Sequence, residues 1–316
     1  MRGVALAVAA LLAAAAVLGA WSWQRFTGPG PLAQDTWVIV PRGEGVDAIA
    51  DPLLFRLGAR IEGADTGLRA GEYAFAARIS ARAVVRQLRK GDTVVRRLTV
   101  LEGLTTAEVV ALVAATEGLQ GPTGRPPAEG TLLPETYHFS YGDQRRDLLE
   151  RMAEAMRRTV ADLWATRQEG LPVSTPGEAV VLASIIEKET AVAEERGLLV
   201  AGVFINRLRK GMSLQSDPTV VYALTSGAGP LGRPLTRTDL GVSSPYNTYV
   251  TRGLPPGPIA NPGRAALAAA VNPEETDAFY FVADGNGGHA FARTLAEHNR
   301  NVAAWRRIQR ERGLRR

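Results

Sequence analysis

The residues of this chain best suited to chemistry are carboxylates in an apolar segment at positions 183–208. Glu187 follows apolar pairs at 181–182 and 185–186, so we expect its side chain to lie where water is scarce. Burial disfavours the charged form of a carboxyl group and raises its pKa. A carboxyl group that keeps its proton near neutral pH can act as a general acid, which makes Glu187 the candidate catalytic residue.

The helix that positions Glu187 has a clear predicted start. Thr175 and Glu178 fit an N-cap and a capping box, and Pro176 fits the first helical turn. Glu187 then lies about three turns into the helix. Glu189 follows two residues later and projects from another face, which favours one catalytic carboxylate and a structural role for Glu189.

A second interpretation of Glu187 is a partly buried glutamate that pairs with Lys188 or Arg196. The segments that follow favour chemistry, because they combine many polar side chains with stiff backbone. They are Asn206, Q-S-D-P-T-V-V-Y at 215–222, P-Y-N-T-Y at 245–249 and G-L-P-P-G-P-I-A-N-P-G at 253–263. Surface loops do not require so many specific residues.

Together these segments resemble the endolytic murein transglycosylases of the MltG, or YceG-like, family. Catalytic domains of that family carry the motifs A-S-I-I-E-K-E-T, V-F-x-N-R-L, D-P-T-V-x-Y, Y-N-T-Y and G-L-P-P-G-P-I-x-N-P-G, and all five occur here in order. The resemblance continues through Y-F-V-A-D-G-N-G-G-H-A-F at 280–291 and E-H-N at 297–299, and back to E-G-T-L-L-P-E-T-Y at 129–137. It covers the chain from Trp37 to Trp305.

The resemblance implies that Glu187 is catalytic and that substrate-binding residues surround it. Short polar side chains in the 215–219 turn can bind sugar hydroxyls, and the tyrosine rings at 246–249 can stack on sugar faces. The candidate substrate-binding residues are Glu129, Tyr137, Asn206, Gln215, Ser216, Asp217, Thr219, Tyr246, Asn247, Thr248 and Tyr249.

Structural roles remain open for several of these residues. Glu135 stands where the family commonly has aspartate, and its longer side chain changes the reach of the charge. Pro134 and Tyr137 can equally brace a turn. Asp217 directly precedes a proline, where aspartate is more often a turn former than a second catalytic carboxylate. The tyrosines at 246–249 can equally belong to a core loop.

Composition narrows the chemistry further. A chain of 316 residues can hold one large domain or two moderate ones. It contains no cysteine, which excludes disulfides and thiolate nucleophiles, and its 3 histidines give little support to a multi-histidine metal site. We therefore expect no metal and no other cofactor. The net charge of +5 is concentrated in an arginine-rich tail at 306–316, typical of a solvated helix end, and we expect no nucleic-acid partner.

The first residues predict a membrane location. An uncharged apolar run from Gly3 to Trp23 is long enough to span a bilayer, and Trp21 and Trp23 fit its interfacial belt. Arg2 precedes the run, so we expect a single-pass anchor in the inner, or plasma, membrane of a bacterium, with the catalytic domain on the periplasmic, or extracytoplasmic, side. A cleavable signal peptide with a site near Leu18-Gly19-Ala20 is the alternative.

The expected fold class is α+β, with an N-terminal transmembrane helix, a small LysM-like αβ subdomain and a larger mixed α+β catalytic domain. The predicted boundaries are 1–24 for the cytoplasmic stub and anchor, 25–35 for a linker, 36–100 for the LysM-like subdomain and 101–316 for the catalytic domain.

Periodicity and turn signals predict the elements of both parts. In the LysM-like subdomain we expect strands at 37–41, 71–75 and 94–100, alternating with helices at 46–57 and 80–89. In the catalytic domain we expect helices at 105–118, 195–210, 264–271 and 295–312 and a hairpin of 279–283 with 289–293. Asn261 reads as the N-cap of the 264–271 helix. The LysM-like part implies either glycan binding or a spacer that holds the active site away from the membrane.

The expected reaction follows from the resemblance and from one carboxyl group where a hydrolase requires two. A lytic transglycosylase cleaves the β-1,4 bond between N-acetylmuramic acid and N-acetylglucosamine and leaves a 1,6-anhydro end. The family resemblance implies endolytic cleavage of glycan strands that terminates their elongation, with a peptidoglycan synthase as a candidate partner. Two alternatives remain: a peptidoglycan hydrolase with Asp217 or Glu129 as base, and a non-catalytic glycan-binding envelope protein.

Overall fold

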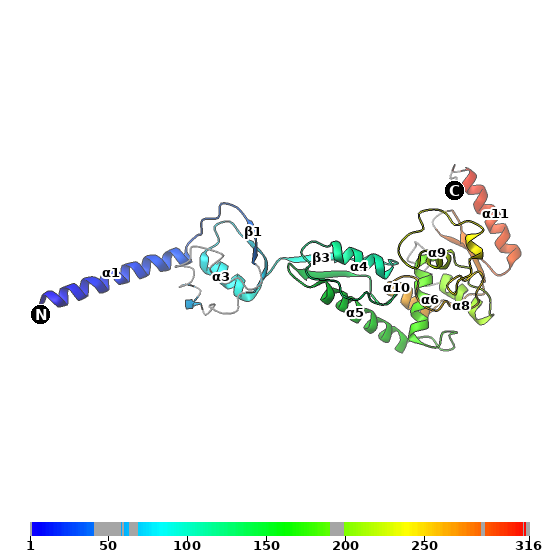
Figure 1. Cartoon of the computed structure of the whole chain (residues 1–316), viewed down its shortest axis with the longest axis horizontal. Coiled ribbons are helices and arrows are strands. Elements are labelled where there is room, and N and C mark those ends of the chain that lie inside the picture. The colour runs from blue at the N-terminus through cyan, green and yellow to red at the C-terminus, as the bar shows by residue number, and fades with distance from the viewer. Residues whose placement is uncertain are drawn as a thin grey trace. The chain divides into compact units, whose positions relative to one another are not determined.

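A computed structural model of the chain describes residues 2–40, 58, 60–62, 69–189, 199–285, 288–311 and 313. These residues form a mixed α+β structure, as predicted, and their strands pair into small two-stranded sheets (Figure 1). The elements in chain order are α1 (Arg2–Thr27), β1 (Thr36–Val40), β2 (Gly71–Phe75), α3 (Ala81–Lys90), β3 (Val95–Thr99), α4 (Thr106–Ala115), β4 (Thr136–Ser140), α5 (Arg145–Ala165), α6 (Pro176–Glu189), α8 (Ala201–Arg209), α9 (Asp217–Thr225), η3 (Asp239–Gly241), α10 (Arg264–Val271), β5 (Tyr280–Ala283), β6 (His289–Ala292) and α11 (Leu295–Glu311).

The chain divides into two compact units. The first comprises Met1–Arg97, Glu117–Gln120 and His138–Gln144, and the second comprises Leu98–Thr116, Gly121–Tyr137 and Arg145–Arg316. The division runs through β3 and β4, which pair with each other. Because the first unit includes two later segments, no single position along the chain separates the units.

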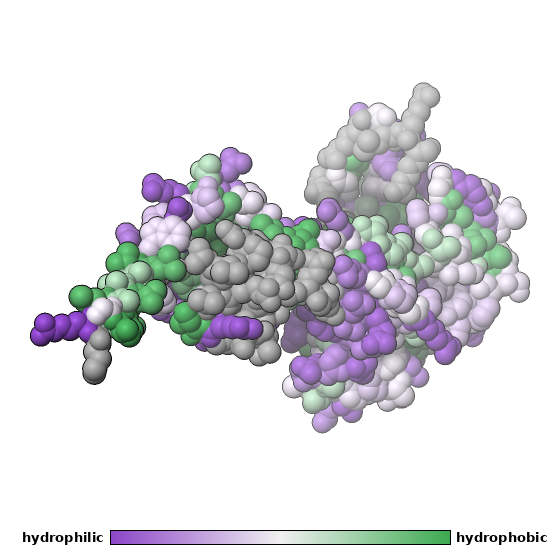
Figure 2. All heavy atoms as spheres, turned by 60° about the vertical axis from the view of Figure 1, so that its left-hand side comes forward, coloured by the Kyte–Doolittle hydropathy of each residue, from purple (hydrophilic) through white to green (hydrophobic). Residues whose placement is uncertain are grey.

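In the first unit, α1 is exposed along almost its whole length, and its apolar side chains form the green surface at the left of Figure 2. Its 26 residues correspond to about 39 Å at 1.5 Å per residue, which exceeds the ~30 Å hydrocarbon core of a bilayer. Among the residues that the structure describes, α1 is the one helix long and apolar enough to cross a membrane. This finding fits the predicted anchor.

The end of α1 packs into the folded part of the first unit. Phe26 is buried in the same apolar cluster as Tyr73 and Leu88. Beyond the helix, the N–H of Gly30 donates to the carbonyl oxygen of Arg78 at 3.0 Å. The segment that the sequence predicts as a linker is therefore held against this unit by hydrogen bonds and by the buried Phe26 ring.

The strands and the helix α3 of the first unit follow the sequence pattern. β1 and β2 pair antiparallel, with Thr36 opposite Phe75. Ser80 caps the start of α3 by accepting from the N–H of Ala83, and Gly91, with φ +76°, ends the helix. The backbone at that position has the left-handed conformation, which glycine adopts without strain.

The LysM-like subdomain is not confirmed. The third predicted strand, β3, does not join the β1–β2 sheet but pairs with β4, which lies much further along the chain. The predicted helix at 46–57 lies outside the described residues. Local periodicity located the strand but could not identify its partner.

The buried centre of the second unit is α6. Every residue from Ala179 to Glu187 is buried, as expected for a helix with apolar residues on all sides. The alanine-rich α10 packs closely on it, together with α5 and α9 (Figure 1). The helix begins at Pro176 as predicted, where Thr175 Oγ1 accepts from the N–H of Glu178 at 3.1 Å.

The C-terminal part of the second unit is the predicted hairpin with a helix packed on it. β5 and β6 pair antiparallel, with Tyr280 opposite Ala292. α11 contacts both strands. The hairpin residues 286–287 lie outside the described residues. The same holds for residues 195–198, the predicted start of the 195–210 helix, which is described as α8 from Ala201 onward.

Candidate active site

Glu187 lies in the last turns of α6, and only 5% of its surface is exposed. Its Oε2 accepts a hydrogen bond of 3.1 Å from the backbone N–H of Gly263. Gly263 is the N-cap of α10, so the carboxylate lies at the positive end of that helix. Burial disfavours a negative charge at this place, whereas the N–H and the helix end favour it. Glu187 is thus a buried carboxyl group held by a backbone donor at a helix N-terminus.

A second backbone segment covers the other side of Glu187. A Cβ placed on Gly103 would lie 3.4 Å from Cγ of Glu187 and 3.4 Å from Cδ of Lys188, so the bare glycine lies against both side chains. The ammonium group of Lys188 donates to the carbonyl oxygen of Gly103 at 3.1 Å. Lys188 therefore braces this segment, while Arg196, the other predicted compensating charge, lies outside the described residues.

Glu129 has a partly buried carboxyl group that binds backbone. Its Oε1 accepts from the N–H of Thr106 at 2.7 Å, and its Oε2 lies 3.5 Å from the hydroxyl of Tyr222. Burial raises the pKa of Glu129, and the Thr106 N–H opposes that shift. Burial also raises the pKa of Tyr222 to about 12. Glu129 thus fixes the start of α4.

The structure brings three predicted site residues, Ser216, Thr219 and Thr248, into one buried hydroxyl network, which the backbone of Gln215 also contacts. Ser216 N–H donates to Oγ1 of Thr248 at 3.0 Å, and Oγ1 of Thr219 lies 2.8 Å from the same atom. The backbone N–H of Gln215 donates to the carbonyl oxygen of Thr248 at 3.1 Å. The network joins the start of α9 to the 245–249 loop.

Glu189 contacts this network, and the sequence assigned it only a structural role. Ser216 Oγ donates to Oε1 of Glu189 at 2.5 Å. Burial raises the pKa of Glu189 to about 7, although the Ser216 hydrogen bond opposes the shift. The two carboxylates of α6 therefore face different partners: Glu187 faces Gly263, and Glu189 faces Ser216.

The aromatic residues of the 245–249 loop are also engaged. Tyr249 donates its hydroxyl to Oδ1 of Asp217 at 2.6 Å, and burial raises the pKa of this tyrosine. The ring of Tyr246 packs at 4.8 Å from that of Tyr222. Asn247 is fully buried, and its amide donates to two carbonyl oxygens of the 240–242 segment.

Two further predicted residues bind backbone away from these contacts. Tyr137 donates its hydroxyl to the carbonyl oxygen of Leu133 at 2.7 Å, which braces the turn before β4. Asn206 donates from its amide to the carbonyl oxygens of Thr276 and Ala278, at 2.7 and 3.1 Å. Their assignment to substrate binding stays a prediction.

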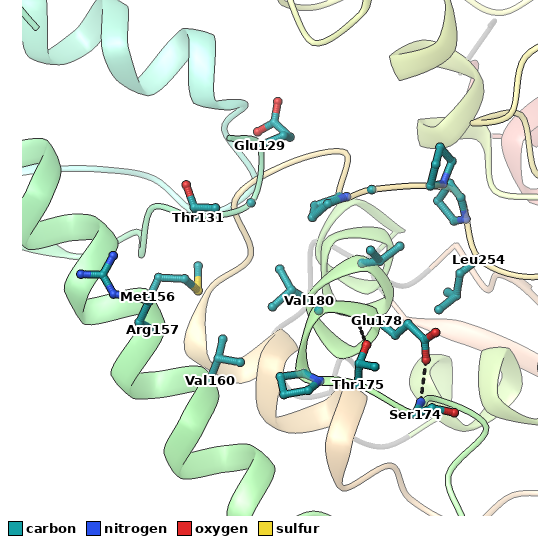
Figure 3. A pocket seen from close by; sticks show the side chains of 18 of the residues that line it. Glu129, Thr131, Met156, Arg157, Val160, Ser174, Thr175, Glu178, Val180 and Leu254 are labelled. Carbon is teal, nitrogen blue, oxygen red and sulfur yellow. Dashed lines mark hydrogen bonds between the residues drawn. The ribbon is translucent and has the colours of Figure 1, made fainter. Parts of the chain in front are cut away.

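A cavity of about 1060 Å³ opens beside the N-terminal half of α6. Figure 3 shows Met156 and Val160 of α5 on one side, Val180 of α6 in the middle and Leu254 on the far side. Glu187 does not line this cavity. The carboxylate of Glu178, which does, accepts from the N–H of Ser174 at 2.6 Å (Figure 3).

A smaller cavity of about 290 Å³ borders the last turn of α6. Lys188, Asp217 and Tyr222 line it, together with parts of α4 and α9. Because Lys188 is the chain neighbour of Glu187, this cavity lies nearer to the candidate acid than the larger one does.

One prediction at this site is wrong. Asn261 does not cap α10, since Gly263 occupies the N-cap position. The side chain of Asn261 is fully buried and binds loops from elsewhere in the second unit, including the N–H of Leu132 at 2.9 Å. The A-N-P-G sequence is typical of a helix start, which explains the wrong prediction. The partners of the Asn261 side chain lie far away in the sequence and cannot be predicted from its neighbours.

The described residues also contain no group of three or more histidine, aspartate or glutamate side chains arranged to hold a metal ion. Proton transfer is the chemistry that a buried carboxyl group such as that of Glu187 can supply.

Comparisons with known proteins identify the family of this chain. A model of the YceG-like family matches residues 39–304. A protein named endolytic murein transglycosylase from Bacillus subtilis is 32% identical over 303 residues, with 83% of this chain and 82% of the relative covered. A protein of the same name from Streptococcus pneumoniae is 30% identical over 287 residues, and this chain spans about half, 51%, of its length. The crystal structure of a YceG-like protein from Listeria monocytogenes has a TM-score of 0.53 and 30% identity, with 85% of this chain and 99% of that chain covered.

Proposed function

The chain belongs to the YceG-like family, and from that premise we propose that it is a membrane-anchored endolytic lytic transglycosylase of peptidoglycan with Glu187 as its acid–base residue. The observation that carries this proposal is the buried Glu187 carboxyl group, held at 3.1 Å by the N–H of Gly263 within two motifs of the family.

The proposed reaction needs one carboxyl group in two protonation states. Glu187 donates its proton to the glycosidic oxygen between N-acetylmuramic acid and N-acetylglucosamine as the bond from C1 to that oxygen breaks. The C6 hydroxyl of the same muramic acid then forms a bond to C1 and gives its proton to Glu187. The products are a 1,6-anhydro end and a free N-acetylglucosamine end, no water is consumed, and Glu187 is protonated again.

Two other candidate carboxylates accept hydrogen bonds from the protein, which supports this single-carboxylate mechanism. Asp217 accepts from the hydroxyl of Tyr249 at 2.6 Å, and Glu129 accepts from the N–H of Thr106 at 2.7 Å. A general base must be within reach of a water molecule with a free acceptor site. The protein contacts of Asp217 and Glu129 reduce their suitability for that task.

One observation favours the hydrolase as a second candidate. A Cβ on Gly263 would lie 1.7 Å from Oε1 of Glu102, so Glu102 lies against the same glycine that binds Glu187. A glycoside hydrolase uses two carboxyl groups on opposite sides of the bond that it cleaves. Glu102 is therefore the carboxylate that a hydrolytic mechanism would use.

The remaining parts of the proposal concern substrate and location. We place the glycan strand against the last turn of α6 and the 215–219 and 245–249 segments, where hydroxyls and tyrosine rings lie close together. We propose that α1 anchors the enzyme in the inner membrane and that the chain after α1 lies on the extracytoplasmic side, where cleavage of new strands ends their elongation beside a synthase.

The product ends test the proposal. The full chain, purified in detergent, is incubated with peptidoglycan in water labelled with ¹⁸O, and the fragments are analysed by mass spectrometry. Unlabelled 1,6-anhydro-N-acetylmuramic acid ends establish the transglycosylase. Reducing ends that carry ¹⁸O establish the hydrolase instead, and binding without any cleavage contradicts both enzymes.

A further inference from the structure

We propose that Asn261 is a positioning residue: its buried side chain fixes the loop whose Gly263 N–H holds the Glu187 carboxyl group. This inference rests on the proposed role of Glu187 as the acid–base residue. Asn261 does not touch Glu187 in any contact described above, so its effect on the reaction would pass through backbone.

Two backbone hydrogen bonds join the segment of Asn261 to the segment after β3. The N–H of Gly103 donates to the carbonyl oxygen of Asn261 at 3.0 Å, and the N–H of Asn261 donates to the carbonyl oxygen of Leu104 at 2.9 Å. The two segments therefore run side by side, as in a short sheet. Their glycines, Gly103 and Gly263, both contact Glu187.

The side chain of Asn261 adds a third segment to this pair. Its Nδ2 donates to the carbonyl oxygen of Leu104 at 3.0 Å and to Oγ1 of Thr106 at 3.2 Å, and its Oδ1 accepts from the N–H of Leu132 at 2.9 Å. The same Nδ2 lies 3.5 Å from Oε1 of Glu129. A primary amide has two N–H donors and one acceptor oxygen, and all of them are used here.

We call Asn261 with its three partners Leu104, Thr106 and Leu132 the Asn261 clamp. The clamp is fully buried at its centre, where the exposed fraction of Asn261 is 0%. No other side chain has the length and the donor and acceptor pattern to make the same bonds, because aspartate lacks the donors and glutamine is one carbon longer. Such a buried, fully satisfied amide holds its partners in one arrangement.

The clamp determines how Glu187 is enclosed on both sides. Gly263 follows Asn261 by two residues and donates to Oε2 of Glu187, while Gly103 precedes Leu104 and lies against Cγ of Glu187. If the two segments separate, the Gly263 N–H moves away from the carboxyl group. Displacement by about 1 Å at a reacting group can cost on the order of 100-fold in rate.

Other charged groups near Glu187 stay the same when Asn261 is replaced by a neutral residue. In the part of the chain that the structure describes, they include Glu102 beside Gly263, Lys188 and Glu189 on α6, and Arg264 next to Gly263 at the start of α10. A change in the pH dependence of the Asn261→Ala variant would therefore report geometry and not a change in net charge.

The test compares Asn261→Ala with Gln87→Ala, in the full chain in detergent, on soluble peptidoglycan strands. Gln87 is a suitable control, because its amide also donates to a backbone carbonyl oxygen, that of Ala74 in the first unit, at 3.0 Å. The readouts are kcat, KM and the alkaline limb of the pH–rate profile, where a general acid loses its proton. The position of that limb does not depend on how much of the sample is folded.

For Asn261→Ala we expect kcat to fall about 100-fold with KM little changed, and the alkaline limb to move up by about one pH unit. The limb moves to higher pH because a weaker hydrogen bond from the Gly263 N–H stabilises the carboxylate of Glu187 less and so favours its protonated form. Thr106→Val, which removes one acceptor of the clamp and preserves the side-chain shape, should shift the limb in the same direction by less. If Asn261→Ala does not fold, the role of Asn261 is tested with Thr106→Val alone.

An unshifted alkaline limb in Asn261→Ala and Thr106→Val would overturn the positioning role, and so would an equal shift in Gln87→Ala. Glu187→Gln separates this inference from the proposed function. If Glu187→Gln keeps its activity, the proposed acid–base residue is wrong; if it is inactive while both clamp variants keep the wild-type limb, only the role of Asn261 is wrong.

Discussion

The backbone N–H of Gly263 donates to Oε2 of Glu187 at 3.1 Å, and on its other side Gly263 lies against the Glu102 carboxyl group. A Cβ at position 263 would lie 1.7 Å from Oε1 and 2.7 Å from Cγ of Glu102. The glycine of the N-P-G motif is thus required by close approach and not by its backbone angles, since its φ is −76°.

Gly263→Ala should therefore displace the Glu102 side chain and disturb the N–H that binds Glu187. We expect activity to fall about tenfold or more, while the melting temperature changes little, because the exposed end of Glu102 can move. Gly177→Ala is the matched control: a Cβ there meets nothing closer than 3.9 Å. Equal activity in the two alanine variants would show that contact at Gly263 is unimportant.

Glu189 should make the stability of the protein depend on pH. Burial raises its pKa from 4.5 to about 7 on folding, so between these values the folded chain holds a proton that the unfolded chain releases. Stability then falls as the pH rises from about 4.5 to about 7 and stays lower above.

Glu189→Gln removes this dependence and can still accept the hydrogen bond from Ser216. We expect the variant to gain on the order of 1 kcal/mol at pH 8 and nothing at pH 5. Apparent melting temperatures at both pH values measure the effect, with Glu150→Gln on the exposed face of α5 as control. A variant with the pH slope of the wild type would contradict this role of Glu189.

The positions of the helices and strands around the site could be predicted from the sequence, whereas their strand-pairing and hydrogen-bonding partners could not. The caps of α3 and α6 lie within four residues of the helix starts, so Ser80, Thr175 and Glu178 were readable in the sequence. The pairing of β3 with β4 and the binding of Asn261 to Leu104, 157 residues away, depend on tertiary contacts. A hydrophobic pattern cannot identify such partners.

For the same reason, only part of the candidate site could be predicted from the sequence. Glu187 was readable because apolar neighbours and a capped helix both lie close to it in sequence. Gly103 and Gly263, which enclose it, come from loops far apart in the chain, and each has the appearance of an ordinary loop glycine. Glu189 seemed structural, and only the folded chain brings it to Ser216.

Tyr137→Phe distinguishes substrate binding from bracing. The hydroxyl of Tyr137 donates to the carbonyl oxygen of Leu133 at 2.7 Å, so its loss should lower the free energy of unfolding by about 1–2 kcal/mol. We expect kcat/KM per folded molecule to stay near the wild-type value. Thermal unfolding and product release are measured on the same samples, and an unchanged melting temperature with impaired kcat/KM would assign Tyr137 to the substrate instead.

Asp217→Asn and Glu102→Gln test the need for a second carboxylate. Neither residue is required in the single-carboxylate reaction, so both variants should still form 1,6-anhydro ends, with rates within about tenfold of the wild type. Asparagine at 217 keeps an acceptor for the hydroxyl of Tyr249. Fragment analysis by mass spectrometry decides the matter, and loss of all cleavage in either variant would implicate that residue as a base.

The most direct test of the central claim is the rate of 1,6-anhydro end formation by Glu187→Gln, measured on peptidoglycan beside the wild type and Glu178→Gln. Glu178 belongs to the same helix, and its carboxylate caps the helix start and lies at the cavity that Glu187 does not line. Since glutamine cannot donate or accept a proton in the reaction, we predict a loss of about 10²- to 10⁴-fold or more in Glu187→Gln, with an unchanged melting temperature. The Glu178→Gln rate should stay close to that of the wild type. Anhydro ends formed by Glu187→Gln at the wild-type rate would contradict the account.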